Sequence, residues 1–99
     1  MSSVTVTEAE MQALIVEAAG WGGWMVYHTF DSRRSQPGFP DLILVRDGVM
    51  MAWELKSGSG RVTPEQQAWV DALALIPGVT ACVIRPGGLS VALRRLTTR

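Results

Sequence analysis

An Asp47-Gly48 turn joins two apolar segments, residues 41–46 and 49–56. Asp-Gly between two such segments is among the strongest short signals for a β-hairpin with a two-residue turn. Apolar residues occupy both alternating faces of the two segments. Because strands that are apolar on both faces have to be covered on both faces, the hairpin predicts a sheet packed between helices.

The flanking segments supply these helices and the remaining strands. Thr7-Glu8-Ala9-Glu10 forms a capping-box pattern, and Thr63-Pro64 is typical of a helix start. We therefore expect helices over residues 8–19 and 64–76, strands over 24–30 and 79–85, and a short helix or turn over 89–96. The first helix has an apolar stripe of Met11, Leu14, Ile15 and Ala18. The order α-β-β-β-α-β predicts an α/β fold with a mixed sheet.

Length and composition narrow the class of protein further. The 99 residues are expected to form a single domain, residues 1–99. Nine basic and nine acidic side chains give a formal net charge of zero, which excludes a polyelectrolyte tail. Cys82 is the lone cysteine and cannot form an internal disulfide. Without an apolar run of about 18 residues or a signal-peptide pattern, we expect a cytoplasmic protein with no membrane contact.

The hairpin register brings charged residues together at one end of the sheet. A two-residue turn at 47–48 places Asp41 opposite Glu54, and Lys56 shares the face of Glu54. Like charges directly opposed across a strand pair are destabilising. A divalent cation such as Mg²⁺, which takes one or two carboxylates as ligands, would relieve the repulsion. The alternative is a structural salt bridge from Lys56 to one of the acids.

These residues resemble a nuclease signature. Gly38-Phe39-Pro40-Asp41 followed by Glu54-Leu55-Lys56 is similar to the PD-(D/E)XK motif, and residues 60–66 and 27–35 are similar to segments of its VRR-NUC branch. The resemblance extends over about residues 8–85. It implies a restriction-endonuclease-like fold and hydrolysis of phosphodiester bonds with Mg²⁺, or with Mn²⁺ in its place.

The resemblance also implies roles for the motif residues. Asp41, Glu54 and the backbone carbonyl of Leu55 would be metal ligands, and Lys56 would position the attacking water. Small members of the family resemble Holliday-junction resolvases, which implies a homodimer acting on branched DNA. Two alternatives stay open: a nuclease acting on linear DNA, and a non-catalytic DNA-binding module that retains the fold.

Residues of the two helices are candidates for completing the site. Gln66 matches a helix glutamine that contacts the active site in the family, although Thr63-x-x-Gln66 is itself a capping box. In the first helix, Glu8 is the preferred additional metal ligand because it lies nearer the apolar face than Glu10.

Polar loops beside the signature carry candidates for DNA binding. Arg33, Arg34 and Arg61, with Ser32 as a weaker partner, are expected to contact phosphates. His28 is a tentative phosphate contact, and the competing interpretation is a half-buried histidine that forms a hydrogen bond within the fold.

Overall fold

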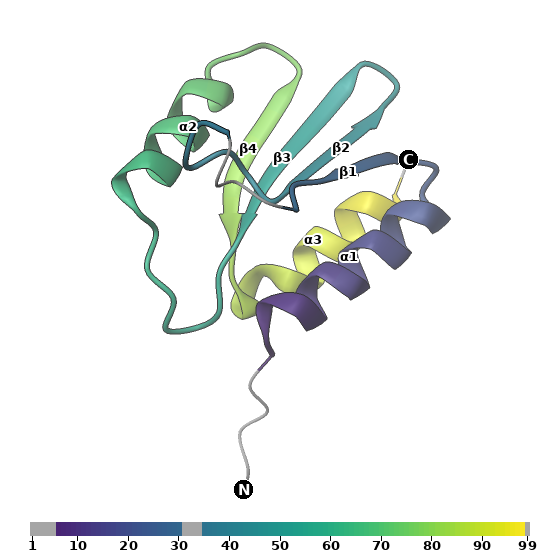
Figure 1. The fold of residues 1–99 in the computed structure, drawn as a ribbon. Coiled ribbons are helices and arrows are strands. Elements are labelled where there is room, and N and C mark those ends of the chain that lie inside the picture. The colour runs from purple at the N-terminus through teal and green to yellow at the C-terminus, as the bar shows by residue number, and fades with distance from the viewer. Residues whose placement is uncertain (1–5, 31–34, 99) are drawn as a thin grey trace, which may run out of the picture.

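The computed structural model describes residues 6–30 and 35–98. Their order is α1 (Glu8–Trp21), β1 (Met25–His28), β2 (Leu42–Arg46), β3 (Val49–Leu55), α2 (Pro64–Ala74), β4 (Val79–Ile84), a short 3₁₀ turn η1 (Pro86–Gly88) and α3 (Leu89–Thr97). The four strands form one sheet in the order β1-β2-β3-β4, in which β4 runs parallel to β3 and the other pairs are antiparallel. The predicted mixed α/β sheet is confirmed (Figure 1).

The central hairpin has the predicted register. Leu42 pairs with Trp53, and the pairing continues without a slip to Arg46 and Val49. Asp47 and Gly48 have φ angles of 50° and 77°. Two consecutive positive φ angles are what a type I′ turn requires, and Asp-Gly adopts them at low cost. The turn therefore fixes which side chains share a face at the far end of the hairpin.

The helices begin where their capping residues predict. In α1 the Glu10 N–H donates to Thr7 Oγ1 and the Thr7 N–H donates to Glu10 Oε1, both at 3.0 Å. Helix α1 ends at Trp21, two residues later than expected, and α2 ends at Ala74, two residues earlier. The C-terminal segment, for which a helix or a turn was open, is the helix α3.

The hydrophobic core lies between the sheet and the pair α1 and α3. Figure 1 shows these two helices side by side against one face of the sheet. The fully buried large side chains of this core include Met11, Ile15, Leu42, Leu44, Met51, Leu55 and Leu96. Leu14, expected in the core, is 44% exposed, because only one side of α1 faces the sheet. None of the helices within residues 6–30 and 35–98 combines the length and apolarity that a bilayer crossing requires.

The opposite face of the sheet is only half covered. Helix α2 packs on β4 and β3, the two strands that it connects. A single helix is about 10 Å wide and neighbouring strands lie about 4.8 Å apart, so one helix covers about two strands. The expectation that the hairpin is buried on both sides is therefore right for β3 and wrong for β2. The uncovered strands expose apolar side chains, such as Met25 at 75% and Tyr27 at 56%.

One arginine joins the helices to the turn end of the hairpin. Arg46 Nη1 donates to the carbonyl oxygens of Gly22 at 2.8 Å and Leu96 at 3.2 Å, and Nη2 donates to that of Thr98 at 2.9 Å. Its guanidinium lies 4.4 Å from the ring centre of Trp24, whose Nε1 also donates to Leu96 O. The carbonyl oxygens at the ends of α1 and α3 thereby accept from a charged donor, which a helix C-terminus favours.

We expect Arg46→Met to lower the free energy of unfolding by about 3 kcal/mol, because three carbonyl oxygens lose a charged hydrogen-bond donor. Urea denaturation followed by circular dichroism measures the loss. Arg94→Met is the matched control, since the Arg94 side chain is exposed on α3, and its effect should stay within about 1 kcal/mol. Equal losses in the two variants would contradict the structural role of Arg46.

Candidate active site

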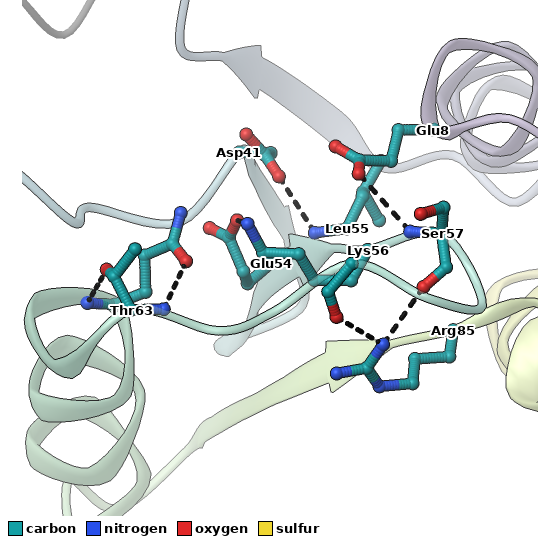
Figure 2. A network of polar contacts seen from close by, with 10 residues as sticks. Glu8, Asp41, Glu54, Leu55, Lys56, Ser57, Thr63 and Arg85 are labelled. Carbon is teal, nitrogen blue, oxygen red and sulfur yellow. Dashed lines mark hydrogen bonds and ion pairs between the residues drawn. The ribbon is translucent and has the colours of Figure 1, made fainter.

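The signature residues meet at the end of the hairpin that lies away from the turn. Because β3 and β4 are parallel, their carboxyl ends lie at the same edge of the sheet. Glu54 is near the end of β3, and Lys56 directly follows that strand. Asp41 immediately precedes the antiparallel β2 and so arrives at the same edge. Figure 2 shows the three side chains gathered at this edge.

Both acids are held in place by the hairpin. Asp41 Oδ2 accepts a hydrogen bond from the Leu55 backbone N–H at 2.8 Å. The Glu54 side chain is nearly fully buried, with a residue exposure of 2%. Lys56 Nζ lies 3.7 Å from Glu54 Oε2. The expected grouping of two carboxyl groups and an ammonium is thus present in the structure.

Burial raises the pKa of Glu54 to about 8, with further increases from the charge of Asp41 and a hydrogen bond to it. Lys56 opposes this increase in the Glu54 pKa, since its ammonium favours the ionised carboxylate, but it does not cancel it. In addition, Glu54 Oε1 is buried and makes no hydrogen bond to any described residue. The metal-free centre therefore favours the protonated form of Glu54.

A partnerless buried oxygen beside a second carboxyl group is suited to a hard divalent cation. Mg²⁺ typically takes one or two carboxylates and completes its shell with waters and substrate phosphates. The described residues contain no group of three or more His, Cys, Asp or Glu side chains arranged to hold a metal. The donor set of Asp41 and Glu54 thus fits Mg²⁺, which does not need a complete protein cage.

Glu8 and Glu10 have different surroundings in the structure. Glu8 Oε2 accepts a hydrogen bond from the Ser57 backbone N–H at 3.2 Å, so it reaches the loop that follows Lys56 (Figure 2). Glu10 is engaged in the cap of α1, where hydrogen bonds from Thr7 lower the pKa of its carboxyl group. Of the two candidates, Glu8 is the one beside the site, and its role as a metal ligand stays a prediction.

Gln66 adopts the capping role that was its alternative interpretation. Its Oε1 accepts from the Thr63 N–H at 2.9 Å, and its own N–H donates to Thr63 Oγ1. The Gln66 amide nitrogen makes no hydrogen bond within the described part of the chain and can still donate to a ligand. A contact with the active site stays a prediction.

The candidates for DNA binding are only partly placed. Arg61 is exposed in the loop before α2. His28 is half-buried, its Nδ1 lies 3.5 Å from Gln12 Nε2 of α1, and its ring packs on Phe30. This contact with α1 puts the His28 ring on the face of the sheet away from Glu54. A half-buried histidine that contacts a residue of the fold is what the structural interpretation expected. Arg33, Arg34 and Ser32 lie outside the described residues.

Sequence reasoning missed Arg85. Its Nη1 donates to the carbonyl oxygens of Ser57 at 2.9 Å and Gly60 at 2.8 Å, and so holds the loop after Lys56. The parallel pairing of β3 with β4 puts Arg85 beside Lys56. Had the sequence analysis predicted that pairing, it would have placed Arg85 next to the site.

Comparison with known proteins identifies the family. The VRR-NUC domain model matches residues 3–85, most of the chain. The chain belongs to the VRR-NUC family. A solved structure described as "VRR_NUC domain protein" has a TM-score of 0.63 and 20% sequence identity, covering 96% of this chain and 88% of its own. That similarity confirms the fold of this VRR-NUC nuclease domain. A search of curated proteins gave no match.

The raised pKa of Glu54 predicts how the stability of the metal-free VRR-NUC domain depends on pH. The unfolded chain ionises Glu54 near its ordinary pKa of 4.5, whereas the folded chain keeps the proton up to about 8. Glu54 therefore makes its full contribution to the free energy of unfolding below pH 4.5. As the pH rises from there through about 8, this contribution is lost, and the free energy of unfolding falls by a few kcal/mol.

Urea denaturation in EDTA at a series of pH values measures this loss. In Glu54→Gln, whose amide does not titrate, the decline between these pH values should shrink. Glu17→Gln, a change at an exposed position, should leave the decline intact. A Glu54→Gln profile parallel to that of the unmodified protein would show that the buried carboxyl group does not titrate as described.

Proposed function

We propose that this VRR-NUC domain is an endonuclease of the PD-(D/E)XK type that hydrolyses DNA phosphodiester bonds with Mg²⁺ or Mn²⁺. The observation that carries the proposal is the buried Glu54, whose Oε1 has no partner in the described structure and whose neighbours are Asp41 and Lys56. In this proposal Asp41, Glu54 and the backbone carbonyl of Leu55 hold the metal. Glu8 is an additional candidate ligand.

The chain's own residues orient the reaction. Asp41 is fixed by the Leu55 N–H, and Glu54 is buried from bulk water. The Lys56 ammonium can hold the attacking water and stabilise negative charge that develops on the phosphorus oxygens. A divalent ion, when bound, would lower the pKa of a water that it holds and neutralise charge on the phosphate.

DNA contact in this proposal comes from basic and polar residues around the centre. Arg61, with Arg33, Arg34 and Ser32, binds phosphates and so sets the position of the strand without reading its sequence. The Gln66 amide nitrogen would donate to the substrate, since the cap uses the oxygen of this side chain. His28 is the weakest candidate, since its ring contacts Gln12.

We expect Lys56→Ala to reduce cleavage roughly a hundredfold or more, because the attacking water loses the group that holds it. DNA affinity should stay within about twofold, because the variant loses only one of several positive charges near the DNA. Gel assays with Mg²⁺ and fluorescence anisotropy measure the two effects. Arg94→Ala removes the same charge from an exposed position and should leave both values unchanged. Unchanged turnover in Lys56→Ala would overturn the role given to Lys56.

Binding of DNA with Mg²⁺ but no cleavage of any substrate would instead favour the non-catalytic DNA-binding module. A crystal soaked in Mn²⁺ tests the metal directly, by an anomalous peak between Asp41 and Glu54. Glu54→Gln should lose that peak. A peak elsewhere would contradict the proposed ligands.

The substrate is proposed to be branched DNA, a Holliday junction or a flap, cut by a homodimer. A domain of this size covers one scissile strand, and a two-fold dimer would present two centres for two symmetric cuts. Labelled junction, flap, nicked and linear DNAs should be cleaved in that order of preference, and light scattering should give the mass of a dimer. Preferential cleavage of linear DNA would remove the branched substrate from the proposal.

A further inference from the structure

A cavity of about 300 Å³ opens beside the candidate active site, on the half-covered face of the sheet. Its lining residues come from three separate parts of the chain: β1, the segment before β2, and α2. They are Tyr27, Thr29, Ser35, Gln36, Phe39 and Trp69. A volume of this size is at the lower end of the range of small-ligand pockets.

The cavity wall is bonded directly to the segment that carries Asp41. The Thr29 N–H donates to the Asp41 carbonyl oxygen at 2.9 Å, and Thr29 Oγ1 donates to that of Pro40 at 3.0 Å. Phe39 lies two residues before Asp41 in the chain, a span of at most about 7 Å. A group in the cavity would therefore lie close to a phosphodiester held at the carboxyl groups.

The aromatic side chains of the cavity are already arranged before any ligand enters. Phe39 and Trp69 form an edge-to-face pair with ring centres 5.1 Å apart and an interplanar angle of 82°. Trp69 Nε1 also donates to the Pro37 carbonyl oxygen at 3.2 Å. Tyr27, across the cavity on β1, is 56% exposed and offers its ring to a ligand. Rings fixed in this way lose little entropy on binding.

The chemistry of the lining selects the kind of ligand. All six of these side chains are uncharged, so the described part of the lining offers no counterion to a phosphate. Aromatic faces with hydroxyl and amide groups nearby instead match a nucleobase, which stacks on rings and forms hydrogen bonds at its edges. A chain of zero net charge also has little general attraction for DNA, so uncharged contacts have to contribute to its affinity.

We propose that this cavity binds one unpaired nucleobase of the DNA strand whose neighbouring phosphate lies at Asp41 and Glu54. The inference rests on the proposed nuclease function and specifies its substrate. A base can enter only after it leaves the helical stack, which costs least where the nucleotide is already unpaired. The pocket therefore selects DNA with an unpaired nucleotide beside the cut, as at a flap, a gap or an open junction.

An abasic scan tests the pocket without requiring cleavage. The probe is a labelled flap duplex, and in each member of a series one nucleotide near the branch lacks its base while the backbone stays intact. Fluorescence anisotropy in EDTA measures the affinity. We expect one position at which loss of the base weakens binding between about 5-fold and 150-fold, the range for a stacked base.

Variants assign that effect to the cavity. Tyr27→Ala should weaken binding of the intact flap and bind the intact and abasic probes with the same affinity. Tyr27→Phe keeps the aromatic ring and should still bind the intact flap more tightly than the abasic probe. Trp21→Ala is the matched control, since Trp21 is an aromatic residue that is 83% exposed and does not line the cavity. Circular dichroism confirms that each variant is folded.

The outcomes separate this inference from the nuclease proposal. A flat abasic scan, or a Tyr27→Ala variant as sensitive to the missing base as the unmodified protein, overturns the pocket even if Lys56-dependent cleavage is observed in Mg²⁺. A position-specific loss that requires Tyr27 supports the pocket even if no DNA is cut. Absence of any DNA binding overturns both.

Discussion

The buried carboxyl group of Glu54 is the constraint on which the rest of the site depends. Taking a carboxylate out of water beside a second acid is unfavourable, and the Lys56 ammonium at 3.7 Å offsets only part of the cost. An apolar residue at this position would remove the cost and pack against the same neighbours. The arrangement therefore makes physical sense where a divalent ion can replace the proton on Glu54 and become the missing partner of Oε1.

The fold separates the residues that stabilise it from those that could perform chemistry. Arg46 and Trp24 join the hairpin to the ends of α1 and α3 near the turn. Asp41 and Glu54 lie at the other end of the same two strands, about five residues or 17 Å away. Because these stabilising contacts lie at the turn end, the acids at the other end are not needed to join the hairpin to the helices.

The sequence was sufficient for features that depend on local rules. Asp47-Gly48 fixes the hairpin register because its turn type is locally determined, and that register brings Asp41 to Glu54. Features that need the three-dimensional packing were missed. The exposure of Tyr27 follows from where α2 comes to lie, and the contact of Arg85 with the loop follows from the parallel pairing of β4. For Gln66 the sequence was ambiguous, because Thr63-x-x-Gln66 is a capping box and Gln66 also matches the helix glutamine of the family. The capping box alone explains the hydrogen bonds observed for Gln66.

The electrostatics of the centre explain how a neutral protein can approach a polyanion. Burial favours the protonated form of Glu54 in the metal-free centre, so the carboxylate of Asp41 is balanced by the ammonium of Lys56. A metal-free centre of this kind does not repel a phosphodiester as two ionised acids would. A divalent ion held by the two acids, as proposed, would add two positive charges while displacing one proton, so the centre would become net positive only with the metal bound. In the proposed function, attraction for the scissile phosphate would therefore depend on the metal, whereas the proposed contact of a base with the uncharged aromatic cavity would not.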